Sequence, residues 1–174
     1  RHDFQKAVPG GTVEYSVRLR KGGRLFYFNY DLAKEMGLIA GDHPLKMNHT
    51  LSKTVLETFG IQIINEYDVM HHTPIPKKHI KPNTYMATRY LQLQHPDKTG
   101  RTSGDGRSIW NGQISFRGRT WDVTSCGTGA TCLSPATAIE KRFFKTGDSS
   151  ASSYGCGYSD LEDGIAAALL SEIF

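Results

Sequence analysis

The feature that most constrains this fold is a pair of strand-like runs in the middle of the chain, separated by a short turn. Residues 108–116 and 120–124 carry β-branched and aromatic side chains at close intervals, and Arg117-Gly118-Arg119 lies between them. Two such runs joined by a glycine-containing turn are typical of a β-hairpin. We therefore predict an α+β fold built mainly on an antiparallel sheet, because neighbouring strands joined this tightly must run in opposite directions.

A glycine turn, Ser103-Gly104-Asp105-Gly106-Arg107, comes directly before the first of these runs. Gly104 and Gly106 have no Cβ, so the backbone there can take a positive φ and approach a ligand closely. Successive N–H groups in such a turn can converge on an anion, and the planar guanidinium of Arg107 suits phosphate oxygens. Two interpretations follow from these residues: a lid over nucleotide phosphates, or an ordinary hairpin turn, for which Asp-Gly is a common signal.

Length and composition indicate one soluble globular domain spanning residues 1–174. This length can bury a sizeable core, with 38% hydrophobic and 22% charged residues. No apolar run approaches the ~20 residues of a membrane helix, so we expect no membrane association. The chain begins at Arg1 with no export signal, and the missing initiator Met suggests a fragment of a longer protein.

The net charge and the cysteine content indicate which kinds of ligand and which cellular setting to expect. The net charge of +4 is dispersed, and the densest basic cluster, residues 77–81, lies among prolines. This pattern is typical of a solvated loop, so we expect no nucleic-acid binding. The cysteines, Cys126, Cys132 and Cys156, are few and odd in number, which favours a reducing, cytoplasmic setting. They form no C-x-x-C pair, so we expect no metal site.

Hydrophobic periodicity and turn residues locate the other elements. Asp31 and Thr50 are the expected N-caps of the first two helices, which Gly37 and Gly60 end. Residues 70–83 and 125–131 are expected to be loops, and the Ser/Gly-rich residues 146–158 a mobile segment. Further strands are predicted at 12–19, 24–30, 61–67 and 84–94, and helices at 32–36, 51–59, 136–144 and 160–174.

Four stretches, in this order, resemble the SelO/YdiU family of kinase-like protein adenylyltransferases. Residues 29–38 are similar to an early acidic segment that ends in Gly-Leu, and residues 104–107 to the family's GDGR turn. Residues 121–127 resemble its W-x-L-K-G-A-G segment, and Asp163-Gly164 with the helix that follows resembles its D-G-R-A…S-E helix. Together these stretches span most of the chain from about residue 25 onward.

The resemblance implies the N-lobe of a kinase-like fold. In that family ATP is held in a reversed pose, so that AMP is transferred to a Ser, Thr or Tyr hydroxyl of a protein substrate. Carried over residue by residue, Gly104, Asp105, Gly106 and Arg107 would contact ATP. Asp163 and Gly164 would line the same pocket, and Glu172 would be the helix acid. The catalytic residues and the Mg²⁺ ligands would belong to a C-lobe that is not part of these 174 residues.

One departure from the family leaves other classes open. The lysine on the family's strand falls on Thr124, and Lys141 and Lys145 are the cations that follow. A neutral threonine supplies no charge to a phosphate, which favours a degenerate, non-catalytic nucleotide- or protein-binding module. A third hypothesis is a cysteine enzyme that pairs Cys126 with a loop histidine such as His72; its nucleophile would need a lowered pKa and a nearby base.

Overall fold

The computed structural model describes residues 2–88, 90–92, 101–103, 108–152 and 155–173. The glycine turn at residues 104–107 lies outside this part of the chain.

The described chain forms an α+β fold around an antiparallel sheet, as predicted. Five strands pair in the order β2-β1-β3-β6-β7, and β4 (Tyr90–Gln92) pairs separately with β5 (Arg101–Ser103). This architecture is consistent with a kinase-like N-lobe. The five strands are β1 Thr12–Leu19, β2 Ile61–Ile63, β3 Ile80–Thr88, β6 Ser108–Phe116 and β7 Arg119–Cys126.

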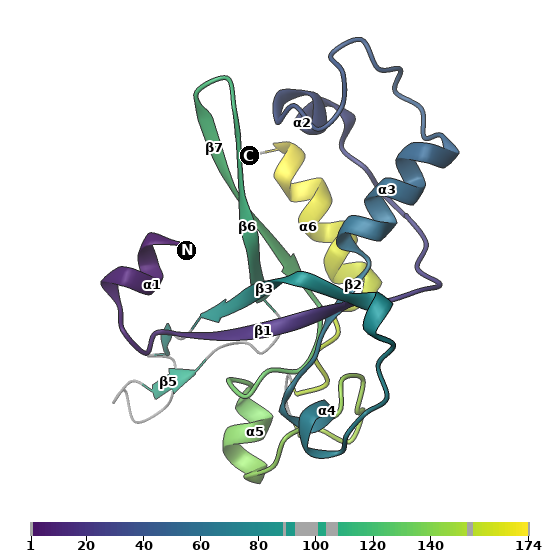
Figure 1. Cartoon of the computed structure of the whole chain (residues 1–174). Coiled ribbons are helices and arrows are strands. Elements are labelled where there is room, and N and C mark those ends of the chain that lie inside the picture. Colours follow the sequence, from purple (N-terminus) through teal and green to yellow (C-terminus); the bar gives the residue numbers. More distant parts are fainter. Residues whose placement is uncertain (1, 89, 93–100, 104–107, 153–154, 174) are drawn as a thin grey trace.

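The helices lie at two ends of the sheet (Figure 1). Near the β6–β7 hairpin lie α2 (Tyr30–Glu35), α3 (His49–Phe59) and α6 (Leu161–Ile173), whereas α4 (Glu66–Met70) and α5 (Pro135–Glu140) lie below the sheet in that view. A short α1 (Asp3–Ala7), which the sequence pattern did not predict, precedes β1. None of the described helices is long and apolar enough to cross a membrane.

Asparagine side chains cap three of these helices. The Oδ1 atoms of Asn29, Asn48 and Asn65 accept the backbone N–H three residues later, at the starts of α2, α3 and α4. The predicted caps Asp31 and Thr50 were wrong by two residues. In α2 and α3 an Asn two residues earlier accepts the free N–H group, so both helices begin before their predicted positions.

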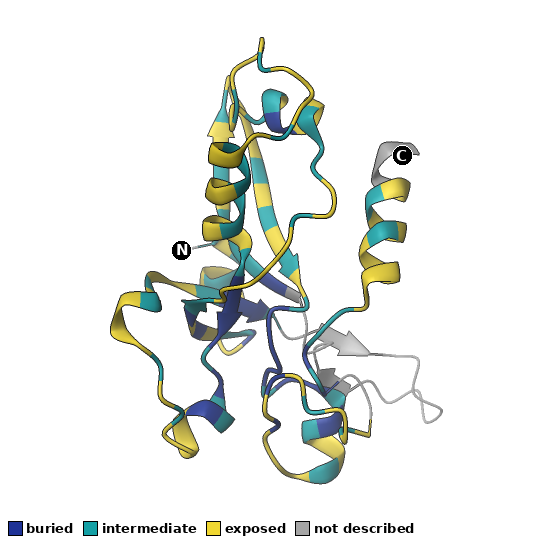
Figure 2. Ribbon diagram, turned by 90° about the vertical axis from the view of Figure 1, so that its right-hand side faces the viewer, coloured by how far each residue is buried: buried dark blue, intermediate teal, exposed yellow. Residues whose placement is uncertain are grey.

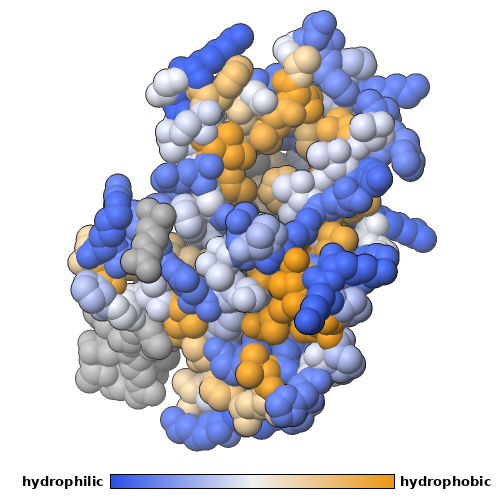
Figure 3. Space-filling model, viewed as in Figure 1, coloured by the Kyte–Doolittle hydropathy of each residue, from blue (hydrophilic) through white to orange (hydrophobic). Residues whose placement is uncertain are grey.

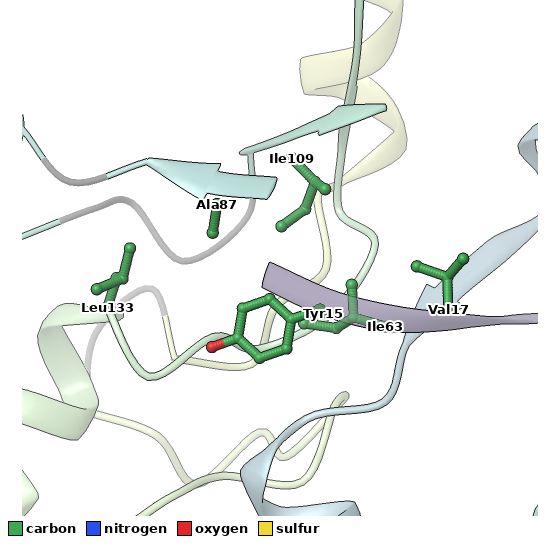
Figure 4. Close-up of a cluster of buried hydrophobic side chains, with 6 residues drawn as sticks. All are labelled: Tyr15, Val17, Ile63, Ala87, Ile109 and Leu133. Atoms are coloured by element: carbon green, nitrogen blue, oxygen red, sulfur yellow. The ribbon is translucent and has the colours of Figure 1, made fainter. Parts of the chain in front are cut away.

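The core lies between the sheet and the loop that follows β7 (Figure 4). Tyr15 and Val17 of β1 pack there with Ile63, Ala87 and Ile109 of the neighbouring strands. Leu133 covers them from the loop. Figure 2 shows buried residues gathered at the centre of the sheet and in the segments beneath it, while α3 and α6 remain largely exposed.

The predicted strand at residues 24–30 was wrong. Those residues carry no strand, Phe26 is 69% exposed, and Tyr30 begins α2. The prediction assumed that the run returns alongside β1. Next to the end of β1, where a returning strand would pair, β2 occupies one edge and β3 the other, so this run does not pair with β1.

Other predicted boundaries shifted where a local feature overrode the pattern. The run 61–67 is a strand only over Ile61–Ile63, because Asn65 caps α4. The expected loop 70–83 ends early, since β3 begins at Ile80. The strand predicted at 84–94 is divided between β3 and β4, and residues 93–94 lie outside the described part of the chain. The helix predicted at 136–144 ends at Glu140, because Lys141 adopts a left-handed conformation.

The turn of the β6–β7 hairpin has a conformation with two positive φ angles. Phe116 pairs with Arg119, so Arg117 and Gly118 form a two-residue loop, with φ of 50° and 77°. This is the geometry of a type I′ turn, in which Asn-Gly is the preferred pair. Arg117 therefore occupies a position that an L residue with a long side chain seldom adopts.

We expect Arg117→Asn to stabilise the protein by about 0.5 kcal/mol, because Asn tolerates the left-handed conformation better than Arg. Thermal unfolding followed by circular dichroism measures the effect. Arg117→Val is the matched opposite, because a β-branched residue is poorly tolerated there, and it should lower the midpoint. Equal midpoints in the two variants would contradict the assigned turn.

Candidate functional site

Three of the segments singled out in the sequence converge at one end of β7. Ser108, the first residue after the glycine turn, pairs with Cys126 at the last position of β7. The Sγ atom of Cys126 lies 3.0 Å from the Oγ atom of Ser159, just before α6. The exit of the glycine turn, the end of β7 and the entry to α6 are thus neighbours in space.

The family-derived residues on α6 lie at both ends of that helix. Asp163 and Gly164 are exposed in its first turn, and the Gly164 N–H donates to the Asp160 carbonyl at 3.2 Å. Glu172 lies in the last turn, nine residues beyond Asp163, or about 13 Å along the axis at 1.5 Å per residue. The two positions therefore lie at opposite ends of α6.

Gly104, Asp105, Gly106 and Arg107 lie outside the described residues. Their two flanks are placed: Ser103 ends β5 and Ser108 begins β6. The flank at Ser108 adjoins the Cys126–Ser159 contact, so the chain re-enters the described part of the fold at the convergence point.

Thr124, which stands where the family has a lysine, is exposed on β7 and pairs with Trp110. The alternative cations are elsewhere: Lys141 ends α5, and Lys145 follows it. In Figure 1, α5 lies below the sheet and α6 above it.

The cysteine-enzyme hypothesis gains no support from the described contacts. The partner described for the Cys126 thiol is the Ser159 hydroxyl, which is not a base at neutral pH. His72 directly follows the C-cap of α4, with φ of 48°. Among the described residues, no three His, Cys, Asp or Glu side chains are grouped so as to hold a metal ion.

Buried polar groups hold the loop between β7 and α5 in place. Asn65 is 2% exposed; its Nδ2 donates to the carbonyls of Ala130 and Phe144 at 2.8 and 2.9 Å. The Tyr15 hydroxyl accepts the Cys132 N–H at 2.9 Å and donates to Glu66 Oε1 at 2.8 Å. Burial raises the pKa of Tyr15 well above its ordinary value, so the hydroxyl stays protonated and able to donate.

Gly157 connects this loop to the segment that leads into α6. Its carbonyl accepts the Gly129 N–H at 3.0 Å, its φ is +76°, and a Cβ atom there would overlap the backbone of Gly129 and Ala130. The Ser/Gly-rich segment predicted to be mobile is therefore anchored at this point. Neither Asn65 nor Gly157 was singled out from the sequence, since an Asn after a strand and a Gly in a Ser/Gly run are both common in loops.

A large apolar cleft opens on the side of the β6–β7 hairpin that faces the helices. Its volume is about 580 Å³, and it reaches from α2 and α3 across the hairpin to α6. Figure 3 shows apolar side chains gathered around a recess in this upper part of the molecule. The residues that line the cleft are Leu25, Tyr27, Phe28, Asn29, Leu32, Ala33, Met36, Leu38, Val55, Phe59, Ile114, Trp121, Asp122, Val123, Thr124 and Ala168.

Asp122 is the carboxylate among these lining residues, and hydrogen bonds satisfy it. Its Oδ1 accepts from Trp110 Nε1 at 2.9 Å and from Gln113 Nε2 at 3.0 Å. The Trp110 bond is the main reason that the pKa of Asp122 lies below its ordinary value, and the Gln113 bond adds to it. The carboxylate is therefore ionised and already paired at neutral pH.

The chain matches no protein-family model, no curated protein and no solved structure. What the described residues define is an α+β domain with an antiparallel sheet, consistent with a kinase-like N-lobe. In it the start of β6, the end of β7 and the entry to α6 meet.

Proposed function

We propose that this chain is the N-lobe portion of a SelO-like protein adenylyltransferase of the cytoplasm. It would bind ATP with Mg²⁺ and help transfer AMP to Ser, Thr or Tyr hydroxyls of protein substrates. The observation that carries the proposal is the convergence of the glycine-turn exit at Ser108, the end of β7 at Cys126 and the entry to α6 at Ser159. Three motifs that are far apart in sequence would thereby contribute to one phosphate-binding region.

Physical considerations support this use of the convergence point. Transfer of a nucleotidyl group requires mainly positioning and neutralisation of charge, which backbone N–H groups and a guanidinium can supply. The exposed hydroxyl and thiol at the point, Ser159 Oγ and Cys126 Sγ, add polar contacts without a competing charge. The Mg²⁺ ligands and the catalytic residues would come from the rest of the kinase-like fold, so the residues present here should not catalyse the transfer alone.

The first test is titration of the full-length protein with ATP and Mg²⁺ by calorimetry. We expect Arg107→Ala to weaken ATP binding roughly tenfold or more, because a charge-assisted contact to phosphate is worth about 1.5–3 kcal/mol. Arg24→Ala is the matched control, since it removes the same charge from the segment before α2. Equal affinity for ATP in the wild-type protein and in Arg107→Ala would show that Arg107 of the glycine turn does not bind the phosphates.

A second test uses Gly164, whose position allows a clean substitution. A Cβ added there meets no atom within 4 Å, so Gly164→Ala should raise stability by about 0.5–1 kcal/mol through helix propensity. If ATP lies against this glycine, the same variant loses affinity for ATP while it gains stability. Unchanged ATP affinity in the stabilised variant would place the nucleotide away from the start of α6.

The second candidate is a non-catalytic nucleotide- or protein-binding module. The observation that favours it is Thr124, a neutral side chain on β7 where the family's strand lysine would stand. Incubating the full-length protein with ATP, Mg²⁺ and candidate protein substrates, followed by mass spectrometry for AMP-modified residues, separates the two functions. AMP on Ser, Thr or Tyr supports the enzyme, and ATP binding without modification supports the module.

A further inference from the structure

The apolar cleft described above adjoins a second, cationic hollow. The second hollow has a volume of about 330 Å³, and Lys34 of α2 and Arg117 of the hairpin turn lie on its wall. Leu38 lines both cavities, so the two lie side by side and meet at this side chain. One end of the combined space is therefore apolar and the other carries two positive charges.

The positive charges of this hollow are not cancelled by acids within its lining. Besides Lys34 and Arg117 that lining consists of glycine, alanine, aliphatic residues and Phe116. Glu35, beside Lys34 in sequence, forms an ion pair with Arg119. In the apolar cleft, Asp122 is engaged by Trp110 and Gln113. An anion in this hollow would thus meet the Lys34 ammonium and the Arg117 guanidinium, which lies over the Phe116 ring.

We propose that the two cavities form one binding site for a long-chain carboxylate, with the hydrocarbon chain in the cleft and the carboxylate between Lys34 and Arg117. The apolar volume lies within the range of ordinary ligand pockets, and burial of methylene groups drives binding there. A charged head alone would gain little at exposed side chains, and an uncharged chain would leave the two cations unused. An apolar cleft beside two cations therefore favours a ligand that has both a hydrocarbon chain and a negative charge.

The lining supplies a spectroscopic reporter. The chain has two tryptophans, and Trp121 lines the cleft, whereas Trp110 does not. Trp110 is kept because it donates to Asp122, and a Trp121→Phe variant shows how much of the quenching comes from Trp121. A bromine atom on a bound chain quenches the fluorescence of a tryptophan that it contacts, so titration with 12-bromododecanoate reports occupation of the cleft directly.

We expect saturable quenching of Trp121 by 12-bromododecanoate. Displacement by unlabelled carboxylates should strengthen roughly tenfold for each two methylenes added from octanoate to dodecanoate. Lys34→Gln combined with Arg117→Asn should weaken dodecanoate binding about tenfold and leave the binding of 1-dodecanol unchanged. Lys53→Gln is the matched control on the neighbouring α3, where Lys53 pairs with Glu57 outside both cavities, and it should not alter either affinity.

Quenching that rises linearly without saturation would overturn the proposal. So would equal affinity for dodecanoate and dodecyltrimethylammonium, or unchanged dodecanoate affinity in the double variant. If that variant unfolds, as circular dichroism would reveal, Arg117→Asn alone gives the answer, because the hairpin turn accommodates Asn. ATP affinity is measured in the same variants and should not change. Failure of the carboxylate proposal can therefore be distinguished from failure of the nucleotide proposal.

Discussion

Gly157→Ala should destabilise the protein by about 3–5 kcal/mol, a large share of the 5–15 kcal/mol by which a domain of this size is stable. Two costs add at this position. A φ of +76° costs a residue with a Cβ about 1–2 kcal/mol. The new Cβ also overlaps the backbone of Gly129 and Ala130, and backbone cannot move aside as a flexible side chain can. We expect a lower unfolding midpoint in urea, measured by circular dichroism.

Gly22→Ala is the control that separates the two costs. Gly22 has a φ of +83°, close to that of Gly157, but a Cβ there meets no atom within 4 Å. It should therefore lose only the conformational term of about 1 kcal/mol. Equal losses in the two variants would show that the loop after β7 does not contact Gly157 as described. Because Gly157 immediately precedes the segment that enters α6, the severe variant should also abolish any ligand binding at the convergence point.

Asn65→Leu should cost about 3–5 kcal/mol, for three reasons that act together. The buried carbonyls of Ala130 and Phe144 both lose their donor, and each unpaired group costs about 1–3 kcal/mol. The start of α4 also loses its cap, the acceptor of the Asp68 N–H, worth about 1 kcal/mol. The leucine side chain is close in size to asparagine, so the loss measures hydrogen bonding rather than a cavity.

The pH dependence of the stability of Asn65→Asp separates the cap of α4 from the two carbonyl contacts. The carboxylate keeps the cap acceptor but cannot donate to the two carbonyls, and burial among acceptors raises the pKa of the new carboxyl. A raised pKa in the folded state means that stability is greatest below the unfolded pKa and is lost as pH rises through the folded one. We therefore expect Asn65→Asp to lose less stability at pH 4 than at pH 7, relative to wild type.

The matched control is Asn48→Asp, the same change at the exposed cap of α3, where Asn48 Oδ1 accepts the Leu51 N–H. Exposure to water keeps its carboxylate ionised, and a negative charge suits a helix N-terminus. It should retain stability at pH 7. If Asn65→Asp behaved like this control, the two carbonyl contacts of Asn65 would be energetically unimportant.

The hairpin and the outline of the fold could be predicted from the sequence because their signals are local. Alternation in β1, the stop at Gly60 and the runs on either side of Arg117-Gly118 each depend on residues within a few positions of one another. The run from Arg24 to Tyr30 looks like a strand by the same local measure. Whether it pairs with β1 depends instead on β2 and β3, which lie on the two sides of β1. These strands come from residues some 40 to 60 positions later in the chain.

The candidate site could be predicted only in part, since motif spacing says which residues matter but not which segments meet. The glycine turn, the end of β7 and the start of α6 were each singled out, and their neighbourhood follows from the Ser108–Cys126 pairing. Asn65, Tyr15 and Gly157 were missed, because each acts on a backbone group more than 25 residues away. The link between Lys34 and the hairpin turn likewise requires the folded chain.

Because β7 is the last strand in the sheet order, its outer edge affects whether this protein associates in concentrated solution. An outermost strand offers a row of unpaired backbone donors and acceptors to any other chain that can extend the sheet. Here that strand carries Arg119 and Asp122, and charges on an edge oppose the approach of an identical copy. At the opposite edge, β2 is only three residues long. Neutralising both charges should therefore make β7 more prone to pair with another chain, and aggregation followed by light scattering would measure this.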